Sequence, residues 1–246
     1  MLTDADVKYL IEKTELSIDS RKFNEAIKYL AQLIENTTPH PYYFKRRAFC
    51  FRMIENFDRA INDYNEALKL EPDDGITYWE RGACYNDKPY FEEIEDENQK
   101  KYFLQKALDD YKASLNRTPT SQEAWLAIID ICLCLNNFYD AVGYYADCKP
   151  HIESHEYKVI RSWYGCLALT FAGEAIGKED PEYLYNQSIR LKWNNWAFYS
   201  IDILLKELEQ KGFETEKLEQ AKEIHRKFIE HFDEPNLCFK PKALIS

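Results

Sequence analysis

Apolar residues recur along most of the chain at intervals of three and four positions, which is the period of an amphipathic helix. The stretches 41–54 and 57–70 show this pattern clearly, and only a short polar turn separates them. Glycine occurs 7 times in 246 residues, which disfavours both turn-rich β-sandwiches and glycine-loop nucleotide folds. The pattern therefore predicts an all-α protein built from short antiparallel helix pairs.

The helical pattern repeats with a period of 34 residues. A shift of this length places Phe23 on Phe57 and Ala26 on Ala60. Small residues allow two antiparallel helices to approach closely, and aromatic residues fill the space between neighbouring hairpins. The register predicts one hairpin per repeat.

The stretch 41–74 resembles the tetratricopeptide repeat family, and Arg47 is its one departure, because Leu is usual there. The resemblance implies a right-handed α-solenoid that binds proteins and whose first helices line a concave surface. The residues that carry the resemblance are Phe44, Ala48, Phe51, Phe57, Ala60, Tyr64, Ala67 and Pro72.

We expect about five or six hairpins in one continuous solenoid over residues 1–235, with a polar-faced helix capping its C-terminal end. A helix is predicted at 181–191, because proline is common at the first position of a helix. The third repeat has an insertion of 13 residues between Tyr85 and Leu104. The expected repeats are 7–40, 41–74, 75–121 and 122–155, followed by degenerate pairs at 156–192 and 193–235 and a tail at 236–246.

Charge and composition narrow the functional classes. The formal net charge of −11 disfavours nucleic acid, which needs a basic face. No stretch is apolar enough to suggest a signal peptide or a membrane span, and the odd number of cysteines, 7, suggests reduced thiols in a cytoplasmic protein. We therefore expect no membrane partner.

No catalytic or cofactor motif is present, so we expect a protein that is not an enzyme and needs no cofactor. Cys148, His151 and His155 have a spacing that could suit a metal. We favour an inter-repeat turn for them, because Pro150 marks a helix end, and we predict no metal site. An unrecognised enzyme on a helical scaffold stays a third hypothesis.

The candidate binding site is the inner face of the basic helix 41–54, which holds four basic residues and no acid. Such a face suits an extended, acidic segment of a partner protein, and reversing Arg46 and Arg52 to Glu should abolish capture without lowering the melting temperature. The alternative is that these charges pair with acidic neighbours on a solvated face. The predicted groove residues are Tyr42, Lys45, Arg46, Phe49, Arg52, Trp79 and Asn86.

Some members of the family clamp the C-terminal carboxylate of heat-shock chaperones. Lys45 falls where that clamp has its first Lys, but Phe49 and Glu80 stand where it needs Asn. A negative side chain at position 80 would repel a carboxylate, so we do not expect this subclass.

The insertion, 86–101, holds six acidic residues together with Tyr90, Phe91 and Ile94. It lacks the alternating acids and central glycine of a calcium-binding loop. Two interpretations stay open, an exposed extension that contacts a partner and a solvated loop or lengthened helix pair. In the alternative functional hypothesis, the chain is a regulatory or assembly subunit that docks on an enzyme through its convex face or this insertion.

Overall fold

The computed structural model describes residues 2–178, 181, 183–186, 191 and 199–232. These residues form two compact units, 1–118 and 119–246, which are described separately. Within the described residues the secondary structure consists of α-helices, one short 3-10 helix and a single isolated bridge between Leu191 and Phe232. The all-α fold class is confirmed.

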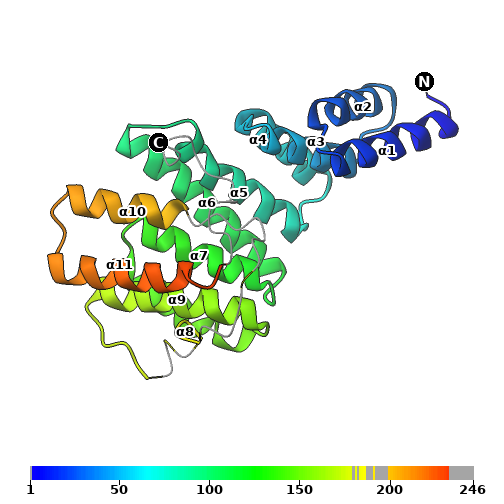
Figure 1. Cartoon of the computed structure of the whole chain (residues 1–246). Helices are drawn as coiled ribbons and strands as arrows, with labels where there is room; N and C mark the ends of the chain where they lie inside the picture. Colours follow the sequence, from blue (N-terminus) through cyan, green and yellow to red (C-terminus); the bar gives the residue numbers. More distant parts are fainter. Residues whose placement is uncertain (1, 179–180, 182, 187–190, 192–198, 233–246) are drawn as a thin grey trace. The chain divides into compact units, whose positions relative to one another are not determined.

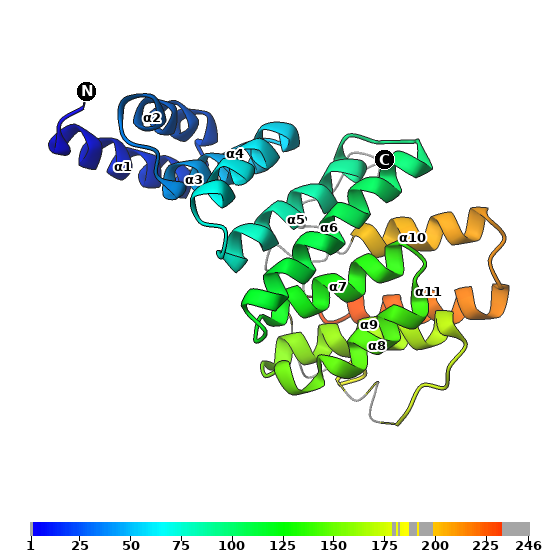
Figure 2. The same ribbon diagram turned by 180° about the vertical axis from the view of Figure 1, so that it is seen from behind.

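The first unit consists of three antiparallel helix hairpins (Figures 1 and 2). The second helix of each hairpin packs on the first helix of the next, α2 on α3 and α4 on α5, as in a solenoid. The helices are α1 (Asp4–Asp19), α2 (Phe23–Asn36), α3 (Pro41–Met53), α4 (Phe57–Leu70), α5 (Gly75–Phe91) and α6 (Glu97–Arg117).

Small residues lie where the helices of a hairpin meet, as the repeat predicts. Ala48 of α3 and Ala60 of α4 are completely buried. At Gly82 of α5, an added Cβ atom would lie 2.9 Å from the ring of Tyr111 on α6. The close approach of these helices therefore depends on the absence of a larger side chain.

Helix starts are determined by polar residues that cap free backbone amides. The Asp74 carboxylate accepts a hydrogen bond from the Ile76 amide at the start of α5. The Asp96 carboxylate accepts one from the Gln99 amide at the start of α6. The short turns between helices therefore supply their own hydrogen-bond partners.

The 13 extra residues of the third repeat lengthen its hairpin. Compared with α3 and α4, they add four residues to the first helix, seven to the second and two to the connecting loop. The loop itself, 92–96, is only five residues long. The insertion therefore lengthens the helix pair and ends in an acidic tip, and a partner contact through this extension stays a prediction.

Two ion pairs occupy equivalent positions in consecutive hairpins. Arg47 of α3 donates to Asp63 of α4 at 2.7 and 2.8 Å, and Arg81 of α5 donates to Asp110 of α6 at 2.8 and 2.6 Å. Arg81 lies 34 residues after Arg47, and Asp63 and Asp110 are both buried. Arg47, the departure from the family pattern, is thus neutralised by a carboxylate on the paired helix.

The second unit begins with the hairpin α7–α8, on which α9 packs. The partner of α9 on its other side is α11, while α10 packs on α7 and on α11. The side chains of Trp163 on α9 and Phe228 on α11 stack with ring centroids 3.9 Å apart. The helices are α7 (Gln122–Cys134), α8 (Phe138–Asp147), α9 (His155–Ala172), α10 (Tyr199–Gln210) and α11 (Thr215–Ile229), with a 3-10 turn at Lys149–His151.

The helix predicted at 181–191 is not found among the described residues of that stretch. Residues 181 and 183–185 form turns, although the Tyr185 amide does donate to the Pro181 carbonyl in a single helical turn. The Leu184 carbonyl accepts a hydrogen bond from His231 Nε2 at 2.6 Å. Residues 182 and 187–190 of this predicted helix lie outside the described residues.

Six cysteines lie in the described residues and all are free thiols, five of them buried in the helical core. Cys238 and the rest of the predicted tail, 236–246, lie outside the described residues. None of the described helices combines the length and apolar character that a membrane crossing requires.

Candidate binding groove

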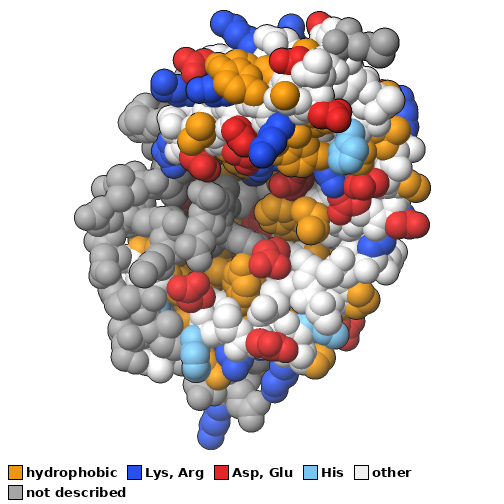
Figure 3. Space-filling view, turned by 90° about the vertical axis from the view of Figure 1, so that its right-hand side faces the viewer, with side chains coloured by type: hydrophobic (Ala, Val, Ile, Leu, Met, Phe, Trp, Pro, Cys, Tyr) orange, Lys and Arg blue, Asp and Glu red, His pale blue; other side chains and the backbone are white. Residues whose placement is uncertain are grey.

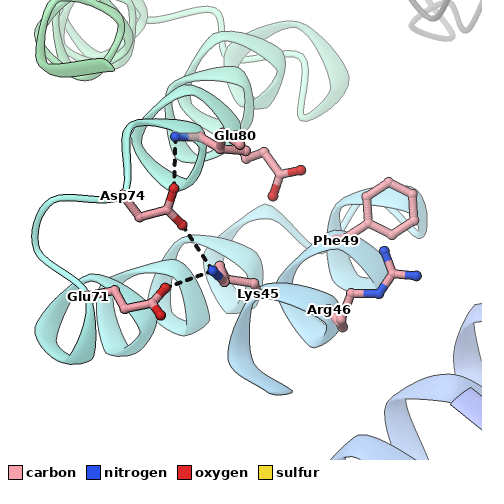
Figure 4. A pocket seen from close by; sticks show the side chains of 7 residues that line it. Lys45, Arg46, Phe49, Glu71, Asp74 and Glu80 are labelled. Atoms are coloured by element: carbon pink, nitrogen blue, oxygen red, sulfur yellow. Dashed lines mark hydrogen bonds and ion pairs between the residues drawn. The ribbon is translucent and has the colours of Figure 1, made fainter. Parts of the chain in front are cut away.

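An open pocket of about 380 Å³ lies between α3 and α5, the first helices of two consecutive hairpins (Figure 4). This position is where the solenoid resemblance places a concave, ligand-binding surface. Ile76 is the most exposed apolar residue of the lining, with 68% of its surface accessible. The lining residues are Lys45, Arg46, Phe49, Glu71, Asp74, Ile76 and Glu80.

Lys45 lies in the pocket with two carboxylates. Its ammonium group is 2.8 Å from Glu71 and 3.0 Å from Asp74, which come from the end of α4 and the start of α5 (Figure 4). Burial alone would lower the pKa of Lys45, but the hydrogen bonds to both carboxylates raise it. Lys45 therefore stays charged, and its charge is already neutralised by the protein.

Arg46 and Tyr42 both contact Glu15 of α1. The Arg46 guanidinium forms an ion pair with this carboxylate, and the Tyr42 hydroxyl donates to it at 2.5 Å. Burial raises the pKa of Tyr42 to about 12, and the hydrogen bond to Glu15 adds to that effect. Phe49 lies beside Arg46 and packs edge-on against Phe23 of α2. Of these residues, Arg46 and Phe49 line the pocket and Tyr42 does not.

Arg52 does not line the pocket, because it forms a buried ion pair with Asp87 of α5. Its two donor nitrogens are 2.9 and 2.7 Å from one Asp87 oxygen, and the Asp87 side chain is only 3% exposed. Reversing Arg52 to Glu would place two negative charges together in the interior. We therefore expect the reversal at Arg52 to lower the melting temperature, in contrast to the expectation from the sequence.

Trp79 and Asn86 lie on α5 but outside the pocket lining. Both side chains are partly buried, and within the described structure Trp79 Nε1 and Asn86 Oδ1 have no hydrogen-bond partner. Their place in the predicted groove stays a prediction, separate from the pocket.

Glu80 is a carboxylate in the pocket that the predicted set omitted. Its side chain points from α5 toward α3, into the space near Lys45 and Phe49 (Figure 4). The buried Tyr64 of α4 donates a hydrogen bond to it. Burial raises the pKa of Glu80, and this hydrogen bond and the positive charges of Arg46 and Arg52 offset only part of the rise.

The sequence predicted the cations of the site better than its anions. Lys45, Arg46 and Phe49 stand out because they share one basic helix. Glu71 and Asp74 lie far from that helix in sequence, in the turn between α4 and α5. The signal for Asp74 was its place directly before Gly75 at a helix start, which is typical of a capping residue. Its capping role and its contact with Lys45 bring it into the pocket.

The described residues hold no group of three or more His, Cys, Asp or Glu side chains placed to bind a metal ion. Cys148 is buried and donates to the Tyr145 carbonyl, and His151 stacks on Trp125 with ring centroids 5.2 Å apart. These contacts account for two of the three residues whose spacing could suit a metal.

The charges on the face drawn in Figure 3 are mixed. Acidic, basic and hydrophobic side chains alternate there, and the described side chains show no continuous basic field. This agrees with the ion pairs of α3, in which each of its four basic residues contacts a carboxylate.

Comparison with known sequences places the repeat in a family. The family described as Tetratricopeptide repeat matches residues 41–74, the same stretch that carries the full set of repeat markers. The heat shock protein STI1 of Saccharomyces cerevisiae is 26% identical over 115 residues, which are 46% of this chain and 20% of that protein. The matched part thus spans about a fifth of this curated relative.

Solved structures with a similar fold include IFIT1. A monomeric mutant of IFIT1 with Gppp-AAAA has a TM-score of 0.62 at 16% identity, covering 92% of this chain and 55% of that one. The human IFIT1 dimer with PPP-AAAA has a TM-score of 0.57 at 16% identity, covering 89% of this chain and 52% of that one. The family match at residues 41–74 and the repeat register together identify a tetratricopeptide repeat within this chain, and the solved structures show a similar helical fold.

Proposed function

We propose that the protein is a non-enzymatic interaction scaffold that binds an extended segment of a partner protein in the groove between α3 and α5. The observation that carries this proposal is the open pocket in which the exposed Ile76 faces the same space as Phe49. Exposed apolar side chains in a concave site provide the anchor contacts that peptide ligands use.

One relative is consistent with this class of function. STI1 of Saccharomyces cerevisiae is described as a heat shock protein. The groove does not match the carboxylate clamp of the chaperone-binding subclass. The Glu80 carboxylate lies in the pocket that would receive the terminal carboxylate of the ligand, and it would repel that group.

The acidic character of the partner stays a prediction with less support than the groove itself. An acidic segment would have to displace Glu71 and Asp74 from Lys45, or Glu15 from Arg46. A nucleic acid meets the same difficulty, since phosphates need cations that are free to pair.

The proposal is tested by selecting phage-displayed random peptides on the full-length protein. We expect selected peptides to bind wild type and to lose about tenfold in affinity for Ile76→Ser, which removes an exposed apolar contact without disturbing the core. Tyr139→Ser, which changes a residue that is 73% exposed on the other unit, is the control and should bind like wild type. Peptides that bind all three proteins equally would contradict the groove proposal.

The alternative, a regulatory or assembly subunit docking through the acidic tip of the insertion, is favoured by one observation. Glu93 and Glu95 are exposed in the loop between α5 and α6. Reversing both to Lys should abolish binding of a native partner in the subunit hypothesis and leave it unchanged in the groove hypothesis. Charge reversal is a better test than deletion of 88–100, because deletion removes the ends of both helices.

A further inference from the structure

We propose that the groove receives a basic side chain, Lys or Arg, of the bound segment at Glu80, next to an apolar residue that packs on Ile76 and Phe49. This inference rests on the proposed function and specifies the chemistry of the segment. It differs from the acidic segment that the four basic residues of α3 suggest.

The first step is the balance of charge in the pocket. Its lining contains two cations, Lys45 and Arg46, and three carboxylates, Glu71, Asp74 and Glu80. Glu15, which pairs with Arg46, adds a fourth carboxylate next to the pocket. The protein's own acids therefore outnumber its bases at this site, and an incoming cation would be attracted.

The second step is that both cations of the pocket already form ion pairs with carboxylates of the chain. Lys45 contacts two carboxylates, and Arg46 contacts Glu15 through two nitrogens. Within the described residues, Glu80 is the pocket carboxylate that forms no ion pair with a Lys or Arg. Arg46 and Arg52 attract it electrostatically, but each forms its ion pair with another acid.

The third step is the environment of Glu80. The Tyr64 hydroxyl holds the carboxylate from the α4 side, and the side chain points into the space between the helices (Figure 4). Burial makes the ionised form costly, so a cation that entered the pocket would relieve this cost. A charged hydrogen bond in such a half-buried site is stronger than one on the surface.

The fourth step is the apolar surroundings. Ile76 is exposed at the start of α5, and Phe49 is half-buried on α3. Lys and Arg carry methylene stems that pack on apolar surface while the charged end reaches a polar group. A basic residue next to an apolar one therefore matches both parts of the pocket.

The test compares the charge of selected peptides and their response to Glu80→Gln. Random phage-displayed peptides are selected on the full-length protein, and those that depend on Ile76 are synthesised with a fluorescent label. We expect Lys or Arg next to an apolar residue to be enriched in them. We expect Glu80→Gln to weaken their binding by about tenfold in fluorescence anisotropy.

Glu95→Gln is the matched control, since it removes the same charge from an exposed position in the loop between α5 and α6, outside the pocket lining. It should change the affinity by less than about threefold. Thermal unfolding of both variants is measured alongside, so that a loss of folding is separated from a loss of binding.

The outcomes separate the two proposals. Ile76-dependent peptides that are enriched in Asp or Glu, or that bind Glu80→Gln as tightly as wild type, would overturn the basic-segment inference and leave the groove proposal standing. A selection without any Ile76-dependent peptide would overturn both.

Discussion

Among single residues, Glu80 is the one at which the proposed binding is linked to stability. A carboxylate held in a partly dry pocket costs stability when ionised, and such costs are common at functional sites. The groups that face it are Tyr64, Arg46, Arg52 and Asp74. None of them forms an ion pair with it in the described structure, so the cost is not removed within the chain.

Glu80→Gln should therefore raise the free energy of unfolding at neutral pH. The folded-state pKa of Glu80 lies above its ordinary value of 4.5, so the folded protein binds this proton more tightly than the unfolded chain. In wild type, the contribution of Glu80 to the free energy of unfolding falls as pH rises from 4.5 through the folded-state pKa. Urea unfolding at a series of pH values checks this, and a Gln variant that is equally or less stable at pH 7 would contradict it.

A second residue-scale prediction concerns Gly165 of α9. A Cβ atom there would overlap the ring of Tyr145 on α8, which the packed core cannot accommodate without moving. We expect Gly165→Ala to lower the free energy of unfolding by about 1–3 kcal/mol in denaturant titrations.

Gly143 of α8 provides the matched control, since an added Cβ would meet nothing within 4 Å. There, Gly143→Ala should stabilise the protein by up to about 1 kcal/mol, because alanine is the better helix former. Equal effects of the two substitutions would show that helix propensity, not the close approach of α8 and α9, governs these positions.

At the scale of elements, the hairpins of the first unit are held by small residues and by ion pairs between their helices. Arg47–Asp63 and Arg81–Asp110 recur in register, and Arg81 also donates to Asn65 of the preceding hairpin at 2.7 Å. Buried pairs of this kind contribute little net stability but are costly to break on one side.

Arg47→Leu, which restores the residue usual in the family, should therefore destabilise the protein by about 2–4 kcal/mol, because Asp63 would be left buried without its cation. The double variant Arg47→Leu with Asp63→Leu should recover more than half of that loss. Thermal and urea unfolding of the full double-mutant cycle measures the coupling. A stable single variant would mean that solvent reaches Asp63 well enough to replace Arg47.

At the scale of the whole molecule, the net charge of −11 acts on any charged ligand. A basic segment would be attracted at long range, and salt would screen that attraction. We expect the association rate of a selected basic peptide to fall by about tenfold between low and high ionic strength in stopped-flow measurements.

Ile76→Ser should keep this salt dependence and dissociate faster, since it removes a short-range apolar contact and no charge. An association rate that does not respond to salt would contradict the role of the net charge and favour an apolar ligand.

The amino-acid sequence is sufficient to predict the helical class, the 34-residue register, the site of the insertion and the small residues at the helix contacts. These features follow from the spacing of residues along one helix or one hairpin, so local periodicity reveals them. It also singled out Lys45, Arg46 and Phe49, which share the face of a single helix and line the observed pocket.

Tertiary packing, in contrast, sets which charges are neutralised and which helix packs on α9. Arg46 pairs with Glu15, 31 residues earlier, and Arg52 with Asp87, 35 residues later. Such partners lie on other helices, and only packing brings them together. The packing of α11 on α9 has the same origin, because this contact depends on the path of the chain through space.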